Sequence, residues 1–188
     1  MQKTAIVIDV YRFCTTVYDA LKLGAKKVYV TNDRFLPRRM KEYSKWQDLI
    51  TFGESKGIKL SWTDYDNCPR DIAKANVEGK RIMIRSSMGA RRVEKAMKEY
   101  DVVFLACMRN YKVYKGIQAT FFADDDHDTY CRELIRSGTY PNRLVENQLM
   151  DIARDRETAK VCYNKEENPF FVKIVREEGT NLLEAIIV

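Results

Sequence analysis

The stretch TAIVIDV, residues 4–10, sets the interpretation of the whole chain. It is a short apolar run rich in β-branched residues, which is typical of a buried β-strand. The helical stretch 15–23 follows it and closes at Gly24, a residue common just after a helix C-terminus. A second β-branched run, 27–31, comes next. A strand, a helix and a strand in this order predict the parallel arrangement of an α/β protein.

The same alternation continues through the first two thirds of the chain. We predict further strands at 48–52, 81–85, 102–106 and 119–122, and helices at 34–45, 69–75, 89–100, 126–137 and 144–156. The tail predicts three more strands, 159–163, 170–175 and 182–188, for which an antiparallel arrangement is open. Residues 1–188 suffice for one large core but not for two, so we expect a single domain. Its expected fold is three layers, α/β/α, with a mostly parallel sheet covered by helices on both faces.

Composition is typical of a folded protein, with 45% apolar and 32% charged residues. No apolar run approaches the roughly 20 residues that a membrane span needs. The N-terminus has an acid inside its apolar stretch and no small-residue cleavage site, so we expect no signal peptide and a cytoplasmic protein. Five cysteines lie at scattered positions without a Cys-x-x-Cys pair, which argues against a zinc knuckle and a disulfide framework.

The formal net charge of +6 favours an anionic partner. The basic pairs Arg38-Arg39 and Arg91-Arg92 lie beside acids inside helical stretches, which is more typical of solvated helix faces than of a nucleic-acid surface. We therefore expect a small anionic substrate, no nucleic-acid partner and no membrane partner. A homo-oligomer remains open.

Missing residues exclude several classes of hydrolase. The chain has one histidine, His127, so phosphatases built on paired histidines or on several histidine ligands cannot be assembled. It has no G-x-S-x-G elbow, no P-loop and no G-x-G-x-x-G turn. It also lacks a Cys-x5-Arg loop. Serine-hydrolase, nucleotide-binding and cysteine-phosphatase chemistry are therefore not expected.

Acids follow the predicted strands, at the edge where parallel sheets bind their ligands. Asp9 lies near the end of the first strand, Glu54 follows the third, and three acids at 124–126 follow the strand at 119–122. Oxygen ligands of this kind suit Mg²⁺, so these acids are candidates for a magnesium site. For Asp9 alone, capping of the following helix is an equal alternative.

Two turns are candidates for binding an anion. Residues 12–16, Arg-Phe-Cys-Thr-Thr, lead from a strand into a helix, and residues 86–89, Ser-Ser-Met-Gly, repeat that arrangement. A helix N-terminus presents unpaired N–H groups to phosphate or sulfonate, and Arg12 can add a bidentate contact. An ordinary threonine cap beside a solvated arginine is the alternative for the first turn.

Five stretches form a pattern when they are taken in order: 7–16 (VIDVYRFCTT), 53–57 (GESKG), 64–69 (DYDNCP), 79–82 (GKRI) and 86–91 (SSMGAR). They resemble the 2-phosphosulfolactate phosphatase family, whose corresponding motifs are V-I-D-V-x-R-A-T-T-T, G-E-R-x-G, F-D-x-G-N-S-P, G-K-x-[IV] and T-T-N-G-T-R. Asn110 matches an asparagine after the next strand, and Asp124-Asp125 lies where that family has Glu-Asp before a helix. The resemblance extends from about residue 4 to residue 135, most of the chain.

The resemblance implies Mg²⁺-dependent hydrolysis of 2-phosphosulfolactate to sulfolactate and phosphate, a step towards coenzyme M in that family. On this hypothesis the catalytic residues are Asp9, Arg12, Glu54 and Asp64, with Asp64 as a general base or a metal ligand. The Mg²⁺ ligands are Asp9, Glu54 and Asp125. The residues that bind substrate are Arg12, Thr15, Thr16, Asn67, Ser86, Ser87, Gly89 and Asn110. Direct attack by water and a phosphoenzyme route both remain open.

The chain also departs from the family pattern. Ser55 replaces the arginine of G-E-R, Cys68 replaces the serine of N-S-P, and Met88 replaces the asparagine of T-T-N-G. The first and last of these changes remove polar groups that we expect to face the substrate. The alternative function is therefore a non-catalytic relative that binds a small phosphorylated or sulfonated metabolite.

Overall fold

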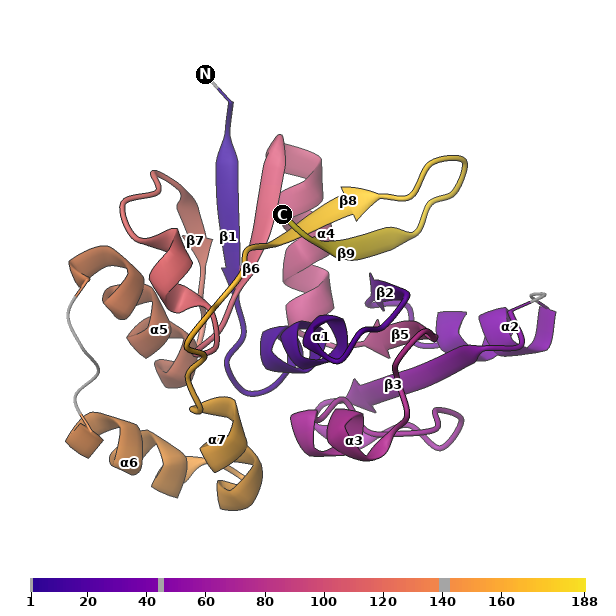
Figure 1. The fold of residues 1–188 in the computed structure, drawn as a ribbon, viewed down its shortest axis with the longest axis horizontal. Helices are drawn as coiled ribbons and strands as arrows, with labels where there is room; N and C mark the ends of the chain where they lie inside the picture. The colour runs from indigo at the N-terminus through magenta and orange to yellow at the C-terminus, as the bar shows by residue number, and fades with distance from the viewer. Residues whose placement is uncertain (1, 44–45, 139–142) are drawn as a thin grey trace.

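A mixed β-sheet forms the middle of the molecule in the computed structural model, which describes residues 2–43, 46–138 and 143–188 (Figure 1). The strands within these residues are β1 (Thr4–Ile8), β2 (Lys27–Thr31), β3 (Leu49–Ser55), β4 (Ile58–Lys59), β5 (Arg81–Arg85), β6 (Val102–Ala106), β7 (Thr120–Phe122), β8 (Val172–Arg176) and β9 (Leu183–Ile187). They form one nine-stranded sheet in the order β4-β3-β5-β2-β9-β8-β6-β1-β7.

The sheet consists of two parallel groups joined by an antiparallel hairpin. Strands β3, β5 and β2 are parallel to one another, as are β6, β1 and β7. The hairpin of β8 and β9 lies between β2 and β6, and each of its strands is antiparallel to both neighbours. The α/β fold and the antiparallel C-terminal strands are thus confirmed. The predicted parallel pairing holds within each group of three strands, not across the whole sheet.

The carboxyl ends of the two groups approach the same place. Figure 1 shows β1 running down the page and β3 and β5 running across it, so that their arrowheads point towards α1 (Phe13–Lys22). The right-handed twist that accumulates across many strands allows such a change of direction within one sheet. The residues that follow these three strands line one cavity.

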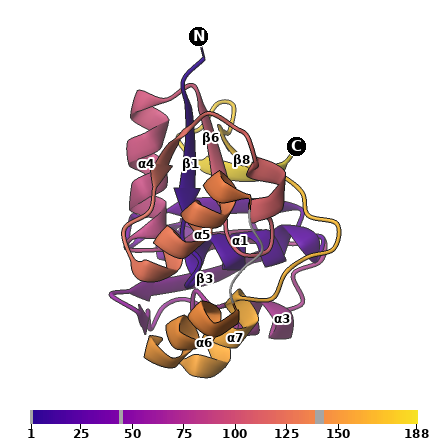
Figure 2. The ribbon, with the colours of Figure 1, turned by 90° about the vertical axis from the view of Figure 1, so that its left-hand side faces the viewer.

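Helices cover both faces of the sheet. Besides α1 they are α2 (Leu36–Tyr43), α3 (Pro69–Lys74), α4 (Gly89–Glu99), α5 (Asp126–Ser137), α6 (Arg143–Ile152) and α7 (Arg156–Cys162), with a 3₁₀ turn η1 (Tyr111–Tyr114). On β1, Ala5 and Val7 pack in one core cluster with α1 and α4, whereas Ile6 and Ile8 pack in another with α5 and η1. Figures 1 and 2 place α6 and α7 below the sheet, beside α3. The predicted three-layer arrangement is therefore present.

Two predicted elements of the tail are wrong. Residues 159–163, predicted as a strand, belong almost entirely to α7. The helix predicted at 144–156 is divided, because α6 ends at Ile152 and α7 begins at Arg156. Asp155 explains the division, since its carboxylate accepts two main-chain N–H groups of α7, at 3.1 and 3.2 Å, and so caps a new helix.

Two helices have ends that differ from the predicted ones. Helix α2 ends at Tyr43, and residues 44–45 of the helix predicted at 34–45 lie outside the described residues. Helix α1 begins at Phe13 instead of at residue 15, because the turn after β1 is tight.

None of the helices in the described ranges is long and apolar enough to cross a membrane.

Candidate active site

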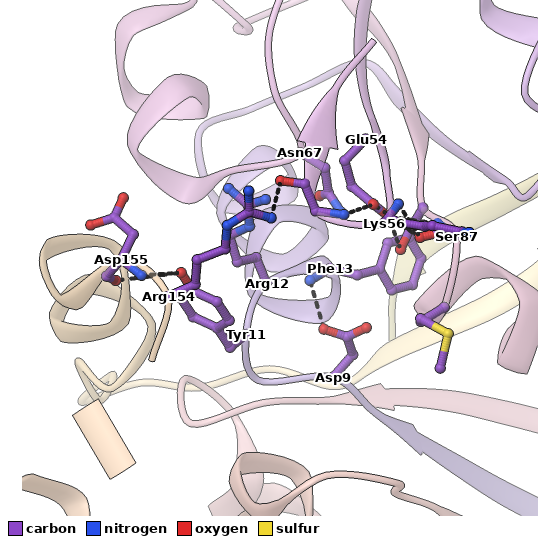
Figure 3. Close-up of a pocket in the computed structure, with 13 residues that line it drawn as sticks. Asp9, Tyr11, Arg12, Phe13, Glu54, Lys56, Asn67, Ser87, Arg154 and Asp155 are labelled. Carbon is purple, nitrogen blue, oxygen red and sulfur yellow. Dashed lines mark hydrogen bonds between the residues drawn. The ribbon is translucent and has the colours of Figure 1, made fainter. Parts of the chain in front are cut away.

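The carboxyl ends of β1, β3 and β5 border a cavity of about 520 Å³ (Figure 3). Its lining comes from the β1–α1 turn, the β3–β4 hairpin, the turns before α3 and α4, and the α6–α7 junction. The lining residues are Asp9, Tyr11, Arg12, Phe13, Glu54, Lys56, Gly57, Asn67, Ser86, Ser87, Met88, Arg154 and Asp155.

Asp9 lies directly after β1, and only 7% of it is exposed. Its Oδ1 accepts a hydrogen bond from the N–H of Phe13 at 2.9 Å, so the carboxylate holds the first turn of α1. Burial raises the pKa of Asp9 from 3.8 to about 6, although Arg92, 4.0 Å from its Oδ2, opposes the rise. Gly89 leaves room for this arrangement, because a Cβ there would come 2.6 Å from the same Oδ2. Asp9 therefore both holds the start of α1 and lines the cavity, so the two alternatives for this residue do not exclude each other.

Glu54 is held at the cavity by four donor groups. Its Oε1 accepts hydrogen bonds from the Ser86 hydroxyl at 3.1 Å, and from the N–H and the hydroxyl of Ser87 at 2.6 and 2.9 Å. Its Oε2 accepts the N–H of Gly57 at 2.7 Å. These bonds join the end of β3 to the turn between β5 and α4. Only 6% of Glu54 is exposed, so its carboxylate has a defined position.

Arg92 forms a buried charge cluster behind the end of β1. Its guanidinium donates to the carbonyl of Ile8 at 2.8 Å, to Asp128 Oδ2 at 2.6 Å and to Asp124 Oδ2 at 2.8 Å. Asp128, with a side chain 1% exposed, also accepts a main-chain N–H of the β1–α1 turn at 2.9 Å. The predicted solvated helix face is correct for Arg91, which is exposed, and wrong for Arg92, which is 8% exposed. The buried carboxylates of Asp128 and, at 4.0 Å, of Asp9 offset the cost of burying its charge.

Arg12 and Asn67 line the cavity in different ways. Nη1 of Arg12 lies 2.8 Å from Oδ2 of Asp66. Burial alone would lower the pKa of Arg12, but Asp66, together with smaller contributions from Cys68 and Tyr11, raises it, so the guanidinium remains a cation. Asn67 is 3% exposed, and its Oδ1 accepts no hydrogen bond from the described residues. A buried acceptor without a donor is unfavourable, so Asn67 Oδ1 is a contact point for a ligand or an ordered water.

Three predicted substrate contacts serve the fold instead. The hydroxyls of Thr15 and Thr16 donate to nearby main-chain carbonyls, at 2.8 Å each. The amide of Asn110 accepts a main-chain N–H at 2.9 Å and donates to a main-chain carbonyl at 3.1 Å. None of the three lines the cavity. Their side chains close turns of their own segments, which a pattern of residue types does not distinguish from ligand binding.

Two further predicted acids are not among the lining residues. Asp64 accepts the N–H and the hydroxyl of Thr51, at 2.8 and 2.9 Å, and pairs with Lys41. Although burial opposes it, these partners lower the pKa of Asp64. Asp125 is exposed and accepts the N–H of Asp128 at 2.8 Å, as the N-cap of α5. Neither side chain lines the cavity, and the general-base and metal roles expected of these acids stay predictions.

The residues around the cavity fit a Mg²⁺ ion that keeps part of its water. The described residues contain no cluster of three or more histidine, cysteine, aspartate or glutamate side chains that could hold a metal. Mg²⁺ does not require such a cluster, because it usually binds one or two carboxylates together with waters and a substrate phosphate. Asp9 and Glu54 are buried carboxylates at this cavity, and Asn67 adds an amide oxygen.

Several cavity residues were not expected from the sequence, among them Tyr11, Lys56, Arg154 and Asp155. Lys56 is two residues from Glu54, so its proximity was a usable signal. Arg154 and Asp155 reach the cavity only through tertiary packing, in which the Tyr11 hydroxyl accepts the N–H of Asp155 at 2.9 Å. No local pattern indicates a contact between residues 144 positions apart.

Known proteins share this pattern of sequence. A family model described as 2-phosphosulpholactate phosphatase matches residues 1–119. A probable 2-phosphosulfolactate phosphatase of Clostridium perfringens (strain SM101 / Type A) is 28% identical, over 88% of this chain and 70% of its own length. A protein of the same description from Clostridium beijerinckii is also 28% identical, over 93% of this chain and 76% of its own length. One from Clostridium acetobutylicum is 33% identical over 61% of this chain and 48% of its own length.

Proposed function

The chain belongs to the 2-phosphosulfolactate phosphatase family, and from this premise we propose that it is a phosphomonoester hydrolase with its active site at the cavity lined by Asp9, Glu54 and Asn67. The proposed reaction releases phosphate from 2-phosphosulfolactate, the substrate in the names of its relatives, and leaves sulfolactate. As the resemblance implies, this would be a step towards coenzyme M.

The observation that carries this proposal is the presence of two buried carboxylates at one cavity. Burying an ionised carboxylate is unfavourable unless the group is paired or coordinates a cation. Oδ2 of Asp9 has no hydrogen-bond donor among the described residues, and neither does Oδ1 of Asn67. A phosphomonoester that enters together with a cation supplies partners for both oxygens.

We propose Mg²⁺ as that cation, held by Asp9 and Glu54. When bound, Mg²⁺ neutralises charge on the phosphoryl group. Arg12 is cationic beside Asp66 and is suited to bind further phosphoryl oxygens. Ser86 and Ser87 keep Glu54 in position, so their hydroxyls act on the site through that carboxylate.

Phosphate release from 2-phosphosulfolactate, with Mg²⁺ and with chelator, tests the proposal. We expect release that stops in chelator and returns with added Mg²⁺. Asp9→Asn and Glu54→Gln should each reduce kcat by about 100-fold or more, because each removes a charged ligand. Asp64→Asn, a carboxylate away from the cavity, is the matched control and should retain activity. Full activity in Asp9→Asn would refute the assignment.

A second candidate is an anion-binding protein without turnover. Met88 lines the cavity where the family pattern has asparagine, and its side chain cannot donate a hydrogen bond to substrate. On this hypothesis the folded protein binds sulfolactate but releases no phosphate from any ester. Calorimetry with sulfolactate beside the phosphate-release assay separates the two candidates.

A further inference from the structure

Two cations line the cavity without a carboxylate partner. Among the ion pairs of the described residues, neither Lys56 nor Arg154 has an acidic oxygen within 4.0 Å of its charged nitrogen atoms. Arg12, at the same cavity, is by contrast paired with Asp66 at 2.8 Å. Cations that line a cavity without partners raise the local concentration of anions there. No acid of the described residues competes with a bound anion for these two side chains, whereas Arg12 already pairs with Asp66 through Nη1.

Packing around its neighbour keeps Arg154 at the cavity. The adjacent Asp155 donates its N–H to the Tyr11 hydroxyl at 2.9 Å and caps α7. In α7, the hydroxyl of Thr158 lies 3.5 Å from Sγ of Cys68, at the start of α3. Nη1 of Arg154 also donates to the carbonyl of Gly57 at 3.4 Å. The guanidinium thus lies against the β3–β4 hairpin although it comes from the other end of the chain.

Lys56 comes from that hairpin. Its backbone has a φ of 52°, in the left-handed region, and its N–H donates to the Ser87 hydroxyl at 3.2 Å. The same hydroxyl donates to Glu54, so the lysine backbone is joined to the turn before α4. Figure 3 shows Asp9 below Lys56 and Arg154, with the three side chains carried by different elements. Asp9 and the two unpaired cations therefore occupy different parts of one cavity.

We propose that Lys56 and Arg154 form a subsite for a second anionic group of the substrate, a sulfonate or a carboxylate, while the phosphoryl group lies towards Asp9. Only the placement of the phosphoryl group rests on the proposed function. An ester of a neutral alcohol leaves both cations unpaired. Arg154 lies outside residues 1–119, so this part of the specificity comes from the segment beyond the family match.

Selectivity between two esters tests the subsite. We would measure kcat/KM for 2-phosphosulfolactate and for isopropyl phosphate, which has no second anionic group, at low ionic strength. The ratio of the two values should fall about fivefold in Arg154→Gln and in Lys56→Gln, the size expected for one exposed charge pair. Arg156→Gln is the matched control, because Arg156 pairs with Asp151 at 2.8 Å and does not line the cavity. An unchanged ratio in both cavity variants would overturn the proposal.

A binding measurement separates failure of the subsite from failure of the proposed function. Calorimetry in the presence of Mg²⁺ measures the affinity for sulfolactate, which has the second anionic group but no phosphoryl group. Weaker sulfolactate binding in Arg154→Gln and Lys56→Gln, but not in Arg156→Gln, supports the subsite even if no ester is hydrolysed. In that case only the proposed hydrolysis is lost. Equal binding by the natural chain and both cavity variants refutes the subsite even if the natural chain hydrolyses 2-phosphosulfolactate.

Discussion

At the scale of one residue, Asp9 has two roles: it holds the start of α1 and it lines the cavity. Its Oδ1 fixes the start of α1 through the N–H of Phe13, and its Oδ2 has no hydrogen-bond donor among the described residues. An asparagine can keep the first contact through its own Oδ1 while removing the charge. Asp9→Asn therefore separates the structural role of this side chain from its electrostatic role.

We expect Asp9→Asn to stabilise the metal-free protein in a pH-dependent way. Because burial raises the pKa of Asp9 from 3.8 to about 6, the native state holds this proton more tightly than the unfolded chain does. Below the lower value both states are protonated and the aspartate has no penalty. Between the two values ionisation increasingly destabilises the native state, by ~2–3 kcal/mol once pH exceeds the higher value. Urea unfolding in chelator should show the variant gaining relative stability across this window, whereas a constant difference would contradict the pKa shift.

Arg92 should be far more important for stability than its neighbour Arg91. Arg92→Met leaves Asp128 buried without its cation, which costs ~3–5 kcal/mol for a broken buried pair. Arg91→Met, at an exposed position one residue away, should change the free energy of unfolding by less than ~0.5 kcal/mol. Adding Asp128→Asn to Arg92→Met should recover part of the loss. Similar unfolding midpoints for the two single variants would show that the buried cluster is not stabilising.

At the scale of the element, Asp125 at the start of α5 is either a helix cap or a metal ligand, and two substitutions distinguish these roles. Asp125 accepts the N–H of Asp128 and is exposed, so the structure gives it the position of a helix cap. Asp125→Ala should lower stability by ~1 kcal/mol, whereas Asp125→Ser, which can still cap, should be nearly neutral. Phosphate release and its Mg²⁺ dependence should persist in both. If activity fell in both while stability did not, Asp125 would be the metal ligand that the resemblance implied.

The β8–β9 hairpin joins the two parallel groups at the scale of the whole molecule. Ala185 pairs with Val28 of β2 and with Ile174 of β8, and only 1% of it is exposed. Ala185→Asp buries a charge without a partner between the two groups and should cost more than ~3 kcal/mol. Ile187→Asp, near the end of the same strand and 50% exposed, is the matched control and should be tolerated. Equal urea midpoints for the two variants would mean that the hairpin is not part of the cooperative core.

The sequence predicted which edge of the sheet carries the candidate site better than it predicted which side chains face it. Asp9 and Glu54 line the cavity, since residues at the ends of parallel strands gather at one edge, and Asn67 joins them from the turn before α3. Asn110 and Asp125 also follow strands but are used by their own turns. The same type of residue at a strand end can either line the cavity or bond within its own turn, and packing decides the direction of the side chain.

From the sequence alone follow the α/β fold, two of the three predicted tail strands and the acids near the carboxyl edge, because hydrophobic period and strand-end polarity are local properties. Tertiary packing alone settles three further features: the hairpin between two parallel groups, the burial of Arg92 and the arrival of Arg154 at the cavity. Each depends on which distant surfaces bury one another. Residues 57 and 154 share no local pattern, yet their contact places a cation beside the proposed phosphate site.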